Sequence, residues 1–108
     1  MKVIIVYITL ANIDLAKKIA RHLVECQYAA CVNIFPNITS LYEWQGEVVE
    51  SGEVVMIVKT TRDKFVDIEN FIISSQQYET PCVISIKIDD GNKKFLKWIE
   101  NYTSYDIN

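Results

Sequence analysis

The chain is poor in the residues from which common cofactor and metal motifs are built. Its 108 residues include three glycines, three cysteines, two prolines and one histidine. Phosphate-binding loops and dinucleotide-binding fingerprints need several closely spaced glycines, and Gly46, Gly52 and Gly91 cannot form either. The cysteines include no C-x-x-C pair, so we expect reduced thiols and no disulfide framework. An organic cofactor is therefore not expected.

Charge and hydropathy exclude two further classes of protein. The formal net charge is -3 and the 11 basic residues are scattered, whereas nucleic-acid binding draws on clustered Lys and Arg. No apolar run approaches the ~20 residues that cross a bilayer, and residues 1–8 lack the length and cleavage site of a signal peptide. We therefore expect a single cytoplasmic domain over residues 1–108, without nucleic acid or membrane as a partner.

Hydrophobic periodicity predicts the element order β-α-β-β-α-β, followed by a helical tail. Asn12 is expected to cap the first helix and Thr61 the second. Pro36 and Asn37 should bend or break their strand, as at an edge or bulge, and Gly52 is a second candidate bulge. The expected strands are 3–8, 30–44, 48–60 and 83–88, and the expected helices are 13–26, 61–75 and a short one carrying Phe95, Trp98, Ile99 and Tyr102.

This order is typical of an α+β, ferredoxin-like βαββαβ fold, in which two helices cover one face of an antiparallel sheet. The two middle strands form a hairpin with arms longer than about 10 residues, against about 5 to 6 for a usual strand. Part of the hairpin should therefore project past the helices and leave an apolar edge uncovered. A closed cyclic oligomer would cover that edge.

Four blocks, in order along the chain, place polar and aromatic residues among strand-like sequence. They are residues 30–34 (ACVNI), 40–46 (SLYEWQG), 59–60 (KT) and 78–81 (YETP). Together they resemble the CutA family, small proteins linked with tolerance to divalent cations. The resemblance implies a homotrimer that binds copper or other divalent cations. It also implies a likeness to the PII signalling trimers, which bind small effectors between subunits.

The chain departs from the family pattern just before the last block. Family members often have His followed by Pro where this chain has Gln76 and Gln77. An amide is a poorer ligand for copper than an imidazole, which weakens the case for a metal site there.

Two cysteines are the candidate metal ligands. The resemblance places Cys31 at the family cysteine, and a thiolate would suit Cu(I); Cys82 follows the last block. Alternatively, Cys31 is a small buried hydrophobic residue within a strand. His22 lies on the polar face of the first helix and is interpreted as a solvated surface residue. No nucleophile-base pair is predicted, so we do not expect an enzyme.

The resemblance places a second group of residues around an intersubunit cleft. This group could contain a Lys59–Glu ion pair that sets the register of the trimer, or it could hold a small polar or cationic ligand. The sequence therefore predicts a trimeric metal-binding protein of metal tolerance. The alternatives are a PII-like small-molecule sensor and a purely structural or interaction role. The expected cleft residues are Tyr42, Trp44, Glu53, Lys59, Tyr78 and Glu79.

Overall fold

The computed structural model describes residues 2–76 and 78–104, and its elements follow the predicted order. The sheet has the strand order β2-β3-β1-β4, and its three pairings are antiparallel. This confirms the α+β fold with a ferredoxin-like strand order. The strands are β1 (Val3–Leu10), β2 (Cys31–Trp44), β3 (Glu47–Thr61) and β4 (Val83–Lys87), and the helices are α1 (Ile13–Glu25), the 3-10 turn η1 (Arg62–Lys64), α2 (Phe65–Ser75) and α3 (Lys93–Ser104).

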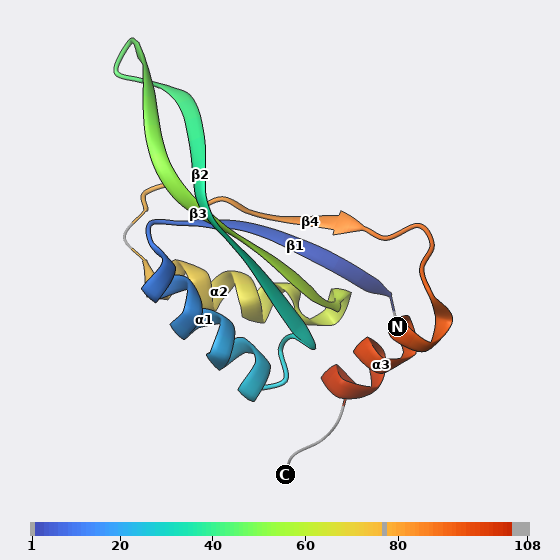
Figure 1. Cartoon of the computed structure of the whole chain (residues 1–108). Coiled ribbons are helices and arrows are strands. Elements are labelled where there is room, and N and C mark those ends of the chain that lie inside the picture. The colour runs from blue at the N-terminus through green and yellow to red at the C-terminus, as the bar shows by residue number, and fades with distance from the viewer. Residues whose placement is uncertain (1, 77, 105–108) are drawn as a thin grey trace.

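The core lies between the sheet and the layer formed by α1 and α2 (Figure 1). Side chains alternate across a strand, so the even-numbered residues of β1 and of the sheet-centre part of β3 face these helices. The apolar stripe of each helix meets them at intervals of three or four residues. Burying one such aliphatic side chain contributes about 1.5–3 kcal/mol. This core includes Ile4, Val6, Ile8, Leu10, Ala16, Ile19, Leu23, Val54, Met56, Val58, Ile68 and Ile72.

The two predicted helix caps have different outcomes. The Asn12 side chain accepts a hydrogen bond from the Leu15 N–H at 2.8 Å, which confirms it as the cap of α1. The prediction for Thr61 is wrong, because its side chain makes no capping bond and the turn η1 separates it from α2. Thr61 is buried instead, with its hydroxyl 3.2 Å from that of Thr103 in α3. A tertiary contact has replaced the local one.

A bulge interrupts the pairing of β2 with β3. Phe35 pairs with Val55 and Ile38 pairs with Glu53, so two residues of β2 stand opposite one residue of β3. The two are Pro36 and Asn37, as predicted, and Asn37 has a φ of 59°. The second predicted bulge, at Gly52, is wrong, since Gly52 pairs regularly with Thr39.

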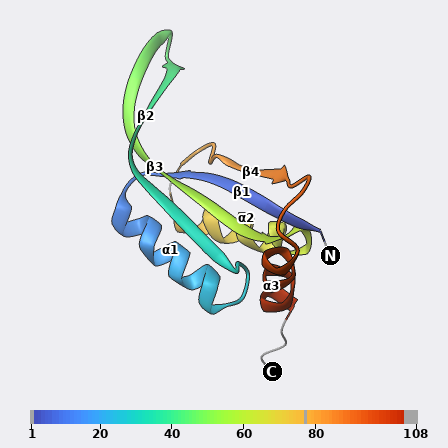
Figure 2. The same ribbon diagram turned by 45° about the vertical axis from the view of Figure 1, so that its right-hand side comes forward.

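The distal part of the hairpin projects beyond the body of the molecule, as predicted (Figures 1 and 2). The neighbouring strand β1 pairs with β3 only from Val54 to Thr61. Beyond that point β2 and β3 pair with each other and turn at Gln45 and Gly46, which both have positive φ. Two such residues are typical of the type I′ turn that matches the twist of a hairpin.

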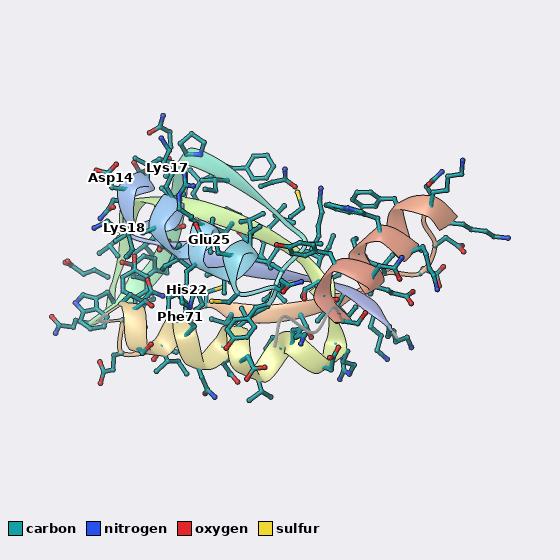
Figure 3. The ribbon with its side chains drawn as sticks, turned by 90° about the horizontal axis from the view of Figure 1, so that it is seen from below. Asp14, Lys17, Lys18, His22, Glu25 and Phe71 are labelled. Atoms are coloured by element: carbon teal, nitrogen blue, oxygen red, sulfur yellow. The ribbon has the colours of Figure 1, made fainter. Side chains whose placement is uncertain are left out.

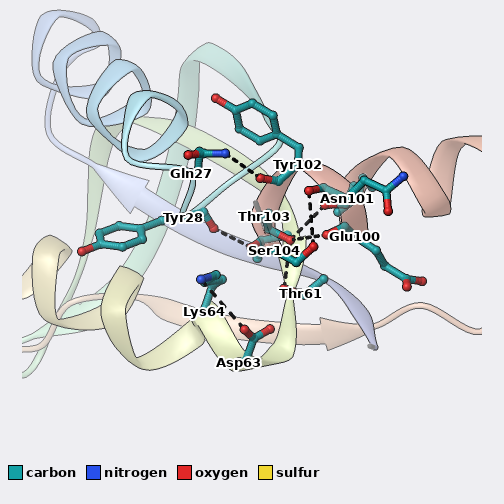
Figure 4. Close-up of polar contacts among 12 residues, drawn as sticks. Gln27, Tyr28, Thr61, Asp63, Lys64, Glu100, Asn101, Tyr102, Thr103 and Ser104 are labelled. Carbon is teal, nitrogen blue, oxygen red and sulfur yellow. Dashed lines mark hydrogen bonds and ion pairs between the residues drawn. The ribbon is translucent and has the colours of Figure 1, made fainter. Parts of the chain in front are cut away.

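The helix α3 covers one end of the other face of the sheet. Its Ile99 packs with Val3 and Ala30. Polar contacts attach the helix to the body, including a hydrogen bond from the Gln27 side-chain amide to the Tyr102 carbonyl at 2.9 Å (Figure 4). Further along this face, Ile84 and Ile86 of β4 are 53% and 47% exposed in the single chain. That apolar surface is the kind that assembly would cover.

Candidate functional site

A cavity of about 770 Å³ opens where the projecting hairpin meets the segment before β4. Strand β2 contributes Tyr42 and Trp44, and β3 contributes Glu53. The segment before β4 contributes Tyr78 and Glu79 from the other side. Ligand pockets in proteins occupy about 300–1,000 Å³, so the cavity has the size of a small-molecule site. The remaining lining residues are Thr9, Val49, Ser51, Thr80 and Cys82.

The bulge in β2 determines which residues face the cavity. Before the bulge, odd-numbered residues such as Phe35 pair with odd-numbered residues of β3. After it, even-numbered residues such as Ile38 and Tyr42 do so, because one extra residue shifts the alternation. Tyr42 therefore shares a face with Glu53, although an uninterrupted strand would have placed them on opposite faces. A bend in an edge strand thus brings the aromatic and acidic residues together.

A side-chain hydrogen bond joins the hairpin to the segment before β4. The Tyr78 hydroxyl donates to a Glu53 carboxylate oxygen at 3.3 Å, across 25 positions of the sequence. Burial raises the pKa of the Tyr78 phenol, and the negative charge of Glu53 and the hydrogen bond raise it further. The Thr9 N–H donates to the Cys82 carbonyl at 3.4 Å, which holds the same segment against β1. The segment before β4 is thus attached to β3 and to β1 beside the cavity.

The expected cleft group is divided between two places. Five of its six members line the cavity, but Lys59 does not. Lys59 lies six residues from Glu53 along β3, about 20 Å in an extended strand. Its ammonium stands 5.5 Å from the centre of the Phe95 ring, and within the described residues it forms no ion pair with a glutamate. The predicted Lys59–Glu pair would need a glutamate of another chain.

Comparison with known proteins places the chain in a family. Residues 4–102 match the model of the CutA1 divalent ion tolerance proteins. The chain belongs to this family. A CutA homolog of Xenopus laevis is 45% identical over 93 residues, which are 86% of this chain and 62% of that protein's length. The divalent-cation tolerance protein CutA of Thermus thermophilus is 40% identical over 99 residues, which are 92% of this chain and 96% of that protein.

Solved CutA structures share the fold. CutA1 of Ehrlichia chaffeensis superposes with a TM-score of 0.90 at 36% identity, covering 97% of this chain and 99% of that one. CutA1 of Oryza sativa superposes with a TM-score of 0.92 at 34% identity, covering 98% of this chain and 97% of that one. Relatives are named for tolerance to divalent cations, not for an enzymatic reaction. Their named locations differ, from chloroplastic in Arabidopsis thaliana to periplasmic in Archaeoglobus fulgidus. Across residues 2–76 and 78–104, no helix could span a membrane.

Membership of the CutA family makes the position of metal ligands an important question. Among the described residues, no three His, Cys, Asp or Glu side chains lie close enough to hold a metal ion. Cys31 pairs with Lys59 near one end of the sheet, while Cys82 lines the cavity beside Thr9 at the other. At least four strand positions, about 13 Å, separate the two cysteines. Residues 2–76 and 78–104 of one chain therefore do not bring together three such ligands.

Of the two residues at which the sequence departs from the CutA pattern, Gln76 and Gln77, only Gln76 lies within the described residues. Gln76 directly follows α2. Both polar atoms of its side-chain amide are inaccessible to solvent and have no hydrogen-bond partner in the described part of the chain. A buried polar group left unpaired costs about 1–3 kcal/mol. This cost favours a partner for Gln76 from outside these residues.

The interpretation of His22 as a solvated surface residue is only partly right, because the side chain is half-buried. Its ring stacks on Phe71 of α2, with 4.1 Å between the ring centres and 11° between the planes (Figure 3). The Cys26 sulfur lies 3.5 Å from its Nε2 atom. The periodicity of α1 alone could not show that α2 packs against this side of the helix. The spacing of His22 and Cys26, one helical turn apart, was the available signal for a contact between them.

Proposed function

We propose that this chain acts in tolerance of divalent metal ions as a homotrimer that binds copper or another divalent cation. The observation that carries the proposal is the match to the CutA1 family over residues 4–102. The uncovered apolar side chains of Ile84 and Ile86 and the projecting hairpin support assembly. We place the protein in the cytoplasm, where its three free cysteines would stay reduced.

The structure restricts how such a protein would bind a metal. Because the described residues of one chain bring no three ligands together, the proposed site needs ligands from more than one chain. Cys31 and Cys82 remain its candidate thiolates, since soft sulfur ligands suit Cu(I). Cys82 shares the cavity with Glu53 and Glu79, whose carboxylates add oxygen ligands nearby.

Calorimetric titration of the reduced protein with Cu(I), Cu(II) and Zn(II) tests this proposal, with the mass of the oligomer measured in the same buffer. We expect stoichiometric copper binding that is lost in Cys31→Ala or Cys82→Ala. Cys26→Ala is the matched control, because Cys26 contacts His22 and is not among the described residues that line the cavity. Weak binding that none of the three variants changes would contradict a role for these thiols. A monomeric mass would contradict the trimer.

A second candidate function is a PII-like small-molecule sensor whose effector binds in the cavity. The observation that favours it is the composition of the cavity, which combines ligand-pocket volume with Tyr42, Trp44 and Tyr78. A ligand held by the native protein raises its melting temperature by mass action, by about 2.7 kcal/mol at 100 times its dissociation constant. Thermal-shift screening of metabolites tests this function. A flat response to every class of metabolite would contradict it.

A further inference from the structure

We propose that the cavity beside the hairpin binds a small organic cation that carries an alkylated ammonium group. This inference rests on the second proposed function, in which the cavity is the effector site. It specifies the chemical class of the effector from three features of the described lining: its charged side chains, its aromatic rings, and the lack of three side chains that could hold a metal ion.

The charge of the lining selects for a cation. Glu53 and Glu79 are the acidic residues among those that line the cavity, and no Lys, Arg or His belongs to its described lining. The whole chain also carries a formal net charge of -3. An anionic effector such as a nucleotide would meet two carboxylates without a compensating cation, and the juxtaposition of like charges disfavours binding.

The aromatic side chains select for a cation of low charge density. Tyr42 and Trp44 are 48% and 55% exposed in the single chain, so the side chains of that chain leave part of each ring uncovered. Tyr78, from the segment before β4, lines the same cavity. Aromatic faces attract cations through the ring quadrupole, and groups of such rings are the usual sites for quaternary ammonium ions. Carboxylates beside aromatic rings complete this type of site.

The part of this cavity that one chain provides does not suit a bare metal ion. Divalent cations need several oxygen, nitrogen or sulfur ligands at close range, and no three such side chains converge in the part of the chain that the structure describes. A cavity of about 770 Å³ is also much larger than one ion requires. An alkylated ammonium group needs no inner-sphere ligands, because its charge is spread over its methyl groups.

The hydrogen bond between Tyr78 and Glu53 prepares the site before a ligand arrives. The bond joins the Tyr78 hydroxyl, on the segment before β4, to a carboxylate oxygen of Glu53, on β3, at 3.3 Å. Glu79 is exposed and is not part of this hydrogen bond. Pre-organised groups lose less conformational entropy on binding. We therefore assign Glu53 to orientation of the site and Glu79 to direct attraction of the ligand.

Fluorescence of Trp44 is the direct test. The chain has two tryptophans, and the other, Trp98, lies on α3 in contact with Phe95. In a Trp98→Phe protein, Trp44 is the single indole reporter. Choline is titrated beside 3,3-dimethyl-1-butanol, its uncharged isostere, on the assembled protein, whose mass is measured in the same buffer. We expect a saturable response to choline and at least tenfold weaker binding of the isostere.

Matched variants locate the binding. Glu79→Gln should weaken choline binding about tenfold. Glu50→Gln should leave it unchanged, because Glu50 lies on the same hairpin, is exposed and does not line the cavity. Equal effects of the two variants would overturn the assignment of Glu79. Calorimetry with choline on the unaltered protein repeats the measurement, so that a folding defect of Trp98→Phe cannot decide the result.

The outcomes separate this inference from the function on which it rests. Equal binding of choline and its isostere would overturn the selection for charge. A Trp44 response to adenosine triphosphate without one to choline would overturn the organic-cation inference and leave the cavity as an effector site. No response to choline by an intact oligomer, together with a flat response to every class of metabolite in the thermal-shift screen, would overturn both the inference and the sensor function.

Discussion

The two halves of the long hairpin differ, although the same two strands form both. In the half next to β1, Met56 and Val58 are completely buried beneath α1 and α2. In the projecting half, Trp44 is 55% and Val48 is 74% exposed. A strand is a stable part of the core where a helix layer covers it, and it is available for binding or assembly where no layer does. The bulge at Pro36 and Asn37 marks the change between the two.

Truncation of one side chain in each half should give the largest contrast. Met56→Ala removes a completely buried side chain of β3, and we expect a loss of about 2–5 kcal/mol in the free energy of unfolding. Val48→Ala, on the same strand, should change it by less than about 0.5 kcal/mol under conditions in which the chain is not assembled. Denaturant unfolding at two protein concentrations measures both. A large, concentration-dependent effect of Val48→Ala would show that assembly buries the projecting half.

Substitution at the bulge tests the border between the halves. Asn37 has a φ of 59°, in the left-handed region that β-branched residues avoid. Asn37→Val should therefore cost about 1–2 kcal/mol, and it should disturb the fluorescence of Trp44 beyond the bulge. Asn37→Gly is the control, because glycine adopts this conformation without strain. Equal stability of the valine and glycine variants would contradict a left-handed residue at this position.

Substitution of His22 tests the contact between α1 and α2, the helix layer that covers the sheet. Its stacking on Phe71 should contribute about 0.5–1.5 kcal/mol beyond simple burial. His22→Ala should therefore lower the stability to unfolding by at least that amount. Lys18→Ala, an exposed substitution on the same helix, should have little effect. If both variants were equally stable, the contact between α1 and α2 at this position would be in doubt.

The smallest expected effect concerns pH and the Tyr78–Glu53 contact. Burial and Glu53 raise the pKa of Tyr78 above its ordinary value of about 10. The folded protein then keeps this proton to a higher pH than the unfolded chain does. The contribution of Tyr78 to the free energy of unfolding is therefore fully present below pH about 10 and is lost as the pH rises through the raised pKa. Tyr78→Phe should remove this part of the decline. Alkaline titration of tyrosinate absorbance and unfolding at several pH values measure the difference.

Much of the fold follows from local pattern. Periodicity predicted the order of the four strands and three α-helices, because burial on one face leaves a repeat of two or of 3.6 residues, but it did not predict the 3-10 turn η1. The cap at Asn12 and the bend at Pro36 followed from local backbone chemistry. The predictions for Gly52 and Thr61 were wrong because strand pairing and a contact with α3 decided those positions.

The sequence by itself therefore determined the elements, the projecting hairpin and, through the four blocks, the CutA family. Only the tertiary structure decided which of those residues meet. The bulge turned Tyr42 toward Glu53, the segment before β4 brought Tyr78 to the same cavity, and Lys59 was placed elsewhere on the sheet. A contact across 25 residues depends on strand register, and each register shift of one residue reverses the face on which a side chain lies.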